Sequence, residues 1–242
     1  MRSVCYLVVI ISIPDIHVVF HRNVLGNSHQ YSLKLGQRKL GDALKQGYMV
    51  HPAFPQTDKA YRSKKLFPAF DRRIPSSDRH DFKEILNDLG LNEEASKMEI
   101  LRATRGRLAA DTYSFEQPLR REEDEKLRSS LFVHGMRYQV LSDDWFTWVS
   151  EGSTVKLIQE PTNPHDANAV AVYTQDDKKL GYVPNFYSQA IFFLIEKNMT
   201  YSARITYLNG KSHSHWWVKL AYESEMPVEQ NVCSEKLAPV MQ

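Results

Sequence analysis

Apolar positions in the first half of the chain predict strands followed by helices. Near the start, runs of β-branched residues at positions 8–11 and 18–20 favour two buried strands. Apolar positions between residues 82 and 89 then recur with the 3.6-residue period of a helix. Ser76 or Ser77 would cap that helix, and Gly90 would end it. A second helix is expected from a cap at Asn92, with glutamates in its first turn, to Gly106.

The pattern changes to short strands in the second half. Strands are predicted over residues 131–140, 155–160, 169–173, 180–183, 200–208 and 215–222. Asn209-Gly210 marks a tight hairpin turn, and a single helix over 185–196 interrupts the series. Many short strands with one helix are typical of a small barrel or half-barrel.

A charged segment separates the two patterns. Residues 116–128, EQPLRREEDEKLR, contain Pro118 and almost no apolar positions, so they predict an exposed linker. The expected fold class is therefore α+β. Its parts are a smaller α+β N-terminal domain over 1–115, the linker over 116–128, a β-barrel over 129–226 and a tail over 227–242.

Composition supports a folded chain. Of 242 residues, 42% are hydrophobic and 11% aromatic, which is enough to bury a core and excludes general disorder. The most apolar stretch, residues 4–20, is interrupted by Pro14 and Asp15, and it lacks a small-residue cleavage site. Cys5 and Cys233 alone cannot form a disulfide framework or a zinc motif. We expect a soluble cytoplasmic protein with no membrane partner, and association with the nucleoid if the protein binds DNA.

Charge is distributed unevenly along the chain. The net charge is +2, but residues 1–79 hold 13 Lys and Arg against 5 Asp and Glu. The densest part, residues 59–73, mixes six basic residues with three aromatic ones, as suits a polyanion partner, although a solvated surface around a Phe-Pro turn would also explain it. The basic residues in question are Lys59, Arg62, Lys64, Lys65, Arg72 and Arg73.

Motifs for catalysis are weak. Gly210-Lys211-Ser212 resembles the end of a phosphate loop, but the first glycine of that motif is missing. No GxSxG turn and no paired carboxylates with a clear spacing are present. His213 and His215 could supply two metal ligands, yet no third follows at a recognisable spacing. We expect no catalytic residues, no cofactor and no metal.

Three segments of the second half stand out together. The turn EPTNPHDANAVAVY over residues 160–173 places Asp166 and Asn168 where their side chains can fix the backbone. HGMRY precedes it at residues 134–138, and LGYVP follows at 180–184. An adjacent arginine and tyrosine offer a cation and a stacking ring.

In this order, the three segments resemble the HIRAN domain over about residues 128–223. The resemblance implies an OB-like β-barrel that binds single-stranded DNA at a free 3′ end. By position, it assigns nucleic-acid contacts to Arg137, Tyr138, Asn163, His165 and Asp166. It assigns the shape of the pocket to His134, Gly135 and Tyr182.

The chain departs from the family pattern at three positions. His165 stands in place of a stacking tyrosine, Thr162 in place of an asparagine, and Asn185 in place of a basic residue. Residues 128–226 also hold nine basic and ten acidic residues, which is a poor balance for unspecific phosphate binding.

The N-terminal part resembles the first subdomain of HipA-type proteins through FPQTDKAYRSKKLFPAFDRRIPSSDR, although the kinase body has no counterpart. The leading hypothesis is a non-enzymatic DNA-binding protein that targets a repair, recombination or defence complex. The alternatives are a protein-interaction adaptor with a vestigial pocket and an enzyme, either a nuclease or a kinase-related protein.

Overall fold

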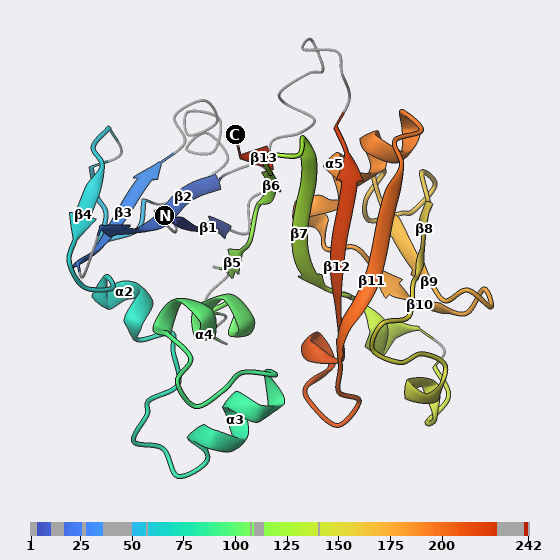
Figure 1. Cartoon of the computed structure of the whole chain (residues 1–242), viewed down its shortest axis with the longest axis horizontal. Coiled ribbons are helices and arrows are strands. Elements are labelled where there is room, and N and C mark those ends of the chain that lie inside the picture. The colour runs from blue at the N-terminus through green and yellow to red at the C-terminus, as the bar shows by residue number, and fades with distance from the viewer. Residues whose placement is uncertain are drawn as a thin grey trace. The chain divides into compact units, whose positions relative to one another are not determined.

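A computed structural model of the chain divides into two compact units, residues 1–117 and 118–242 (Figure 1). The strand backbone is described at residues 4–10, 17–25, 28–35 and 240–241. Backbone and side chains are described at residues 50–56, 58–106, 108, 114–139 and 141–226. Within this part of the chain, no helix combines the length and the apolar character needed to cross a bilayer.

The N-terminal unit contains a five-stranded antiparallel sheet in the order β4-β3-β2-β1-β5. Its strands are β1 (Val4–Ile10), β2 (His17–Leu25), β3 (Ser28–Leu35), β4 (Tyr61–Ser63) and β5 (Ser114–Glu116). The two strands expected from the β-branched runs are confirmed as β1 and β2.

The helices of this unit within the described residues are α2 (Pro68–Asp71), α3 (Phe82–Asp88) and α4 (Lys97–Thr104). The predicted helix over 82–89 is confirmed as α3, although its N-cap is Asp81 and not Ser76 or Ser77. The predicted start of the next helix at Asn92 is wrong. Ser96 caps α4 in a capping box with Glu99, and this box satisfies two backbone donors at once.

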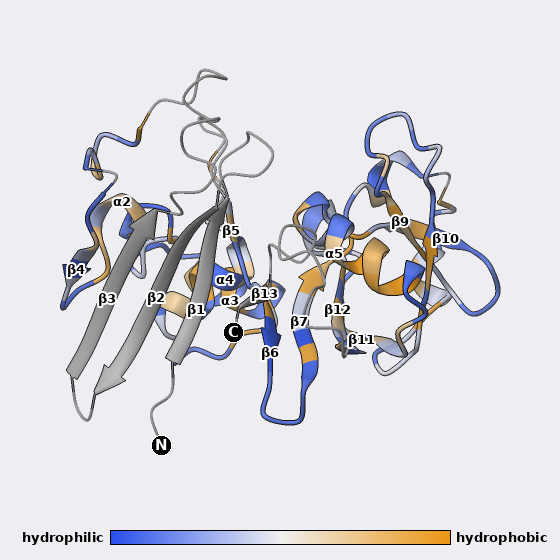
Figure 2. Cartoon of the chain, turned by 90° about the horizontal axis from the view of Figure 1, so that it is seen from above, coloured by the Kyte–Doolittle hydropathy of each residue, from blue (hydrophilic) through white to orange (hydrophobic). Residues whose placement is uncertain are grey.

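The charged segment 116–128 contains the division between the two units, after Gln117, but most of it is a β-hairpin and not an exposed linker. β6 (Leu119–Arg121) pairs antiparallel with β7 (Lys126–Phe132). Leu119 and Leu127 are fully buried, while the charged residues between them form the turn, drawn in blue in Figure 2. These two leucines face the core, and the surrounding charges hid them in the sequence.

The remaining strands belong to the C-terminal unit. They are β8 (Lys156–Gln159), β9 (Val170–Tyr173), β10 (Lys179–Tyr182), β11 (Tyr201–Leu208), β12 (Val218–Glu225) and β13 (Val240–Met241). One sheet has the order β10-β9-β8, and the other has the order β11-β12-β7-β6-β13. β13 pairs parallel with β6 inside the predicted tail over 227–242; the rest of that tail lies outside the described residues.

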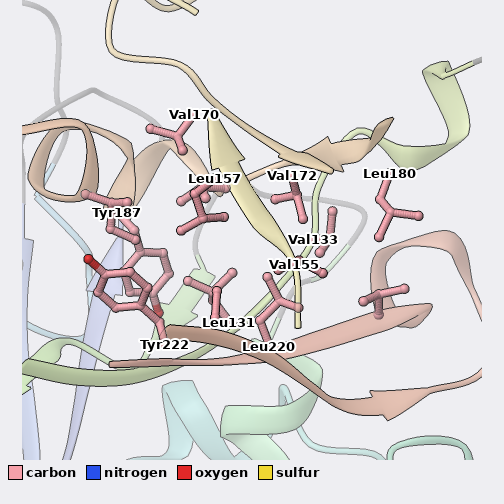
Figure 3. Close-up of a cluster of buried hydrophobic side chains, with 14 of the residues drawn as sticks. Leu131, Val133, Val155, Leu157, Val170, Val172, Leu180, Tyr187, Leu220 and Tyr222 are labelled. Atoms are coloured by element: carbon pink, nitrogen blue, oxygen red, sulfur yellow. The ribbon is translucent and has the colours of Figure 1, made fainter. Parts of the chain in front are cut away.

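Two isolated bridges join the two sheets into a small barrel. His134 pairs with Tyr182, linking the end of β7 to β10, and Thr154 pairs with Arg204, linking the start of β8 to β11. The predicted α+β class with a C-terminal β-barrel is therefore confirmed. The barrel interior holds branched aliphatic side chains from every strand of the ring, several of them visible in Figure 3.

One helix packs against this core. α5 (Asn185–Glu196) has the predicted bounds, and it buries Tyr187, Ala190, Ile191 and Leu194. Two predicted strands are shifted along the chain, because a 3₁₀ helix occupies the end predicted for the first and the start predicted for the second. η1 (Met136–Tyr138) follows β7, and η3 (Ser214–Trp216) precedes β12.

Candidate functional site

A cavity of about 630 Å³ opens beside the bridge between His134 and Tyr182. Its walls come from three segments that are separate in the sequence. The lining residues are His134, Gly135, Tyr138, Gln139, Asn163, His165, Asp166, Ala169, Tyr182, Val183 and Asn185. The structure thus brings together seven of the eight pocket residues suggested by the sequence, and the eighth, Arg137, contacts Tyr138 from outside the wall.

The first wall is a tight turn after β7. Gly135 has φ +70°, a left-handed conformation that side-chain-bearing residues seldom adopt, and it redirects the chain into η1. Met136 is buried and anchors η1 to the core, so Arg137 and Tyr138 are exposed. The Tyr138 side chain is 73% exposed.

Arg137 and Tyr138 form one unit on this turn. The guanidinium carbon of Arg137 lies 4.5 Å from the centre of the Tyr138 ring, and a hydrogen bond joins Nη2 to the tyrosine hydroxyl. An exposed ring of this kind provides a flat surface for a base, and its neighbouring cation can meet a phosphate.

The second wall is the Asn-Pro-His-Asp turn. Asn163 Oδ1 accepts a hydrogen bond from His165 N at 3.0 Å, and Asp166 Oδ1 accepts one from Asn168 N at 2.8 Å. Two such side-chain-to-backbone bonds fix the turn, as predicted for Asp166. Asp166 Oδ2 also accepts from the Ser188 hydroxyl of α5 at 2.8 Å, which ties the turn to the helix.

The third wall depends on the Tyr182 hydroxyl. This hydroxyl donates to Glu160 Oε2 at 2.9 Å, and it accepts from Lys179 Nζ at 2.7 Å and from Asn163 Nδ2 at 3.2 Å. Lys179 and Glu160 also form an ion pair at 2.6 Å. The network therefore connects a cavity residue, Asn163, to a pair of opposite charges.

Electrostatics support this network. Burial acts to raise the pKa of Glu160, but hydrogen bonds from Lys179 and Tyr182 outweigh it, so that pKa lies below its ordinary value. Burial acts to lower the pKa of Lys179, and its bonds to the same partners raise it overall. Both groups are therefore charged at neutral pH. Sequence reasoning missed Glu160 and Lys179, because nothing in the chain shows that charges 19 residues apart form a pair.

The lining of the cavity is acidic in character. Among the described residues that line the cavity, Asp166 is the one carboxylate, two are histidines, and none is a lysine or an arginine. A carboxylate accepts hydrogen bonds and repels anions. The cavity therefore suits a hydroxyl or amino donor better than a phosphate.

The N-terminal basic residues differ in exposure. Lys59, Arg62, Lys64, Lys65 and Arg72 are exposed. Arg73 is buried, and its Nη1 donates to the Gly106 carbonyl at 2.8 Å. Its assignment to a basic surface is therefore wrong, because this guanidinium supports the fold of its own unit.

Metal binding finds no support at the histidines. The rings of His213 and His215 stack with centres 5.0 Å apart, and His213 caps η3. No group of three or more His, Cys, Asp or Glu side chains in the described part of the chain could hold a metal ion.

Comparison with known proteins identifies a family for the C-terminal unit. Residues 126–231 match the model of the HIRAN domain family. No curated protein matches the chain. A structurally similar Lactobacillus plantarum protein, solved by a structural genomics consortium, is 24% identical, with a TM-score of 0.34. The match covers 40% of this chain and 96% of that one.

The HIRAN domain of human HLTF is also similar in structure. The match to its crystal structure has 15% sequence identity and a TM-score of 0.31, and it covers 47% of this chain and 82% of the HLTF chain. The match to its NMR structure has 18% sequence identity and a TM-score of 0.31, and it covers 49% of this chain and 88% of the HLTF chain. Over residues 126–231 the chain matches the HIRAN domain family, and the family resemblance read from its sequence is confirmed for this region.

Proposed function

We propose that the C-terminal unit binds single-stranded DNA and holds the terminal nucleotide, with its free 3′ hydroxyl, in the cavity beside Tyr138. The observation that carries this proposal is the exposed Arg137–Tyr138 unit at the rim of the cavity. The match to the HIRAN domain family supports a nucleic-acid-binding role.

Each wall has a part in this proposal. The terminal base stacks on Tyr138, and Arg137 contacts the phosphate that precedes it. Asn163, held by Tyr182, and the exposed His165 contact the base or sugar. The volume of about 630 Å³ falls within the range of about 300–1,000 Å³ that is typical of small-ligand sites.

Asp166 gives the proposal its end preference. Its carboxylate accepts a hydrogen bond from a 3′ hydroxyl and repels a 3′ phosphate. Two of its lone pairs already serve Asn168 and Ser188, and a carboxylate has about four acceptor positions. A free 3′ end is therefore favoured over a phosphorylated one.

The chain would act as a non-enzymatic targeting module for repair, recombination or defence machinery. The five exposed basic residues within segment 59–73 of the N-terminal unit would add backbone attraction that the near-neutral barrel lacks. The similarity of this unit to HipA-type proteins stays a prediction.

Binding of labelled oligonucleotides tests this function. The set contains a single strand with a free 3′ hydroxyl, the same strand with a 3′ phosphate, and a blunt duplex, each at two salt concentrations. Tyr138→Ala should weaken binding to the free end by about 1–3 kcal/mol, the contribution of one stacked base. Arg137→Ala should also weaken it and lower its salt dependence.

Lys178→Ala is the matched control. Lys178 lies 4.6 Å from the Trp148 ring, so this variant removes one cation from a similar contact outside the cavity. It should bind as the wild type does. Equal affinity for all three oligonucleotides would move the activity to the basic N-terminal residues. Absence of binding to any of them would favour the adaptor hypothesis.

A further inference from the structure

A series of ring contacts leads away from the cavity. It begins at His134, which lines the cavity and whose ring centre lies 5.9 Å from that of His215. His215 stacks on His213 at 5.0 Å with an angle of 23° between the rings. His213 in turn contacts the Trp216 ring at 6.0 Å. Four rings therefore form a continuous series from the cavity wall to the loop between β11 and β12.

The local sequence fixes this series in place. His213 Nδ1 accepts a hydrogen bond from His215 N at 3.4 Å, which holds the His213 ring at the start of η3. Trp217 Nε1 donates to the Ser212 carbonyl at 2.8 Å, and its ring lies 5.2 Å from that of the buried Trp145. The loop is thus attached to the core through Trp217, and the neighbouring rings are held at its surface.

Core packing does not account for these rings. Trp145 and Trp217 pack in or against the barrel core, whereas His213 is exposed and Trp216 is half-buried. Metal binding does not account for them either: His134 is a third histidine near the pair, but no group of three such side chains in the described chain could hold an ion, and stacked rings do not converge on one ion. Exposed rings in an ordered series are the feature that single-stranded nucleic acids use for stacking.

We propose that the nucleotides preceding the terminal one stack along His213 and Trp216, so that the bound strand leaves the cavity over η3. This inference rests on the proposed function and extends it to the path of the strand. Stacking on a ring face tolerates any base, so the path adds affinity without sequence preference. Exposed Lys211, in the same loop, supplies a cation for the backbone.

A length series of oligonucleotides, titrated into the full chain, tests the path. The probes are thymidine mono-, di- and tetranucleotides with free 3′ hydroxyls, and they are compared on the wild type and four variants at one salt concentration. His213→Asn removes the ring but keeps a side chain that can cap η3. It should lower tetranucleotide affinity about tenfold and leave mononucleotide affinity unchanged.

Two further variants sharpen the test. His213→Phe retains a ring and should restore most of the tetranucleotide affinity. His80→Asn makes the same change at an exposed histidine of the N-terminal unit and should have no effect. A tetranucleotide affinity that is unchanged in His213→Asn, or not restored in His213→Phe, overturns the path.

Tyr138→Ala separates this inference from the proposed function. If it weakens binding of every probe while His213→Asn weakens none, the cavity binds the strand end and the path alone is wrong. If Tyr138→Ala weakens none of the probes, the proposed function fails, and the path fails with it.

Discussion

A single hydroxyl organises one wall of the cavity. The oxygen of Tyr182 bonds to Asn163, Glu160 and Lys179 at once, so it connects a ligand-facing amide to a charged pair. The bonds of this hydroxyl to Glu160 and Lys179 involve charged groups, which contribute about 1.5–3 kcal/mol each, so they hold the oxygen in place where Asn163 Nδ2 can donate to it.

Tyr182→Phe is therefore expected to affect both stability and binding. Removing the hydroxyl should lower the free energy of unfolding by about 1–3 kcal/mol, measured by denaturant titration. It should also weaken binding of the free 3′ end, since Asn163 Nδ2 loses its bond to this hydroxyl. The control, Tyr201→Phe, removes a hydroxyl that bonds to the Leu157 backbone away from the cavity. That variant should lose stability and keep its affinity; equal affinity in both variants would contradict the role of Tyr182.

Residues of the site were predictable where their chemistry is local. Gly135 at a turn and Asp166 beside Asn168 act through backbone neighbours, and a short sequence window contains those neighbours. Glu160 and Lys179 act through a partner across the sheet, which the sequence does not reveal. Arg73 was misassigned for a related reason, because its acceptor is a carbonyl 33 residues away.

At the scale of elements, the barrel closes at a very tight contact. Gly181 in β10 lies against the His134 carbonyl, and a methyl group added there would overlap that backbone oxygen and approach the Val133 side chain at 2.9 Å. The close approach of β10 to the end of β7 therefore requires glycine. The bridge between His134 and Tyr182 is part of the same contact.

Gly181→Ala should separate these two segments. We expect a loss of about 1–3 kcal/mol in stability, the usual cost of overpacking, together with a loss of oligonucleotide binding. Gly152→Ala is the control, because it should lose a similar amount of stability without moving β10. Gly152 has φ +88° and nothing within 4 Å of an added methyl, so the cost is backbone strain of about 1–2 kcal/mol. Thermal unfolding and binding are measured on both. Retained binding in Gly181→Ala would show that the cavity does not depend on this contact.

Elements were predictable where one periodicity dominates. α5 has the expected bounds because its apolar face is continuous and Pro184 stands at its N-cap. β7 ends earlier than its apolar pattern suggests, because the turn at Gly135 interrupts it. The hairpin of β6 and β7 was hidden because two leucines among many charges do not form a period.

At the scale of the whole molecule, the basic segment 59–73 and the cavity belong to different units. The five exposed basic residues lie in the N-terminal unit, and the cavity lies in the C-terminal one. Affinity and end preference should therefore respond to separate sets of substitutions.

Neutralising the basic residues tests this separation. Replacing Lys59, Arg62, Lys64, Lys65 and Arg72 by Gln should reduce the slope of log affinity against log salt by about 0.7 for each phosphate that is no longer neutralised. The preference for a 3′ hydroxyl over a 3′ phosphate should remain. Arg73→Gln should lower the melting temperature instead, since its guanidinium is buried. An unchanged slope in the five-residue variant would show that these residues do not touch DNA.

The bridge between His134 and Tyr182 has one more consequence. The barrel closes there through a single pair of residues, and the cavity opens beside that same pair. A ligand in the cavity lies next to the joint, so occupancy and closure are thermodynamically linked: what binds the closed form also stabilises it. Occupancy of the cavity should therefore slow hydrogen exchange of the amides in this bridge, because a ligand that binds only the closed barrel lowers the population of the open form.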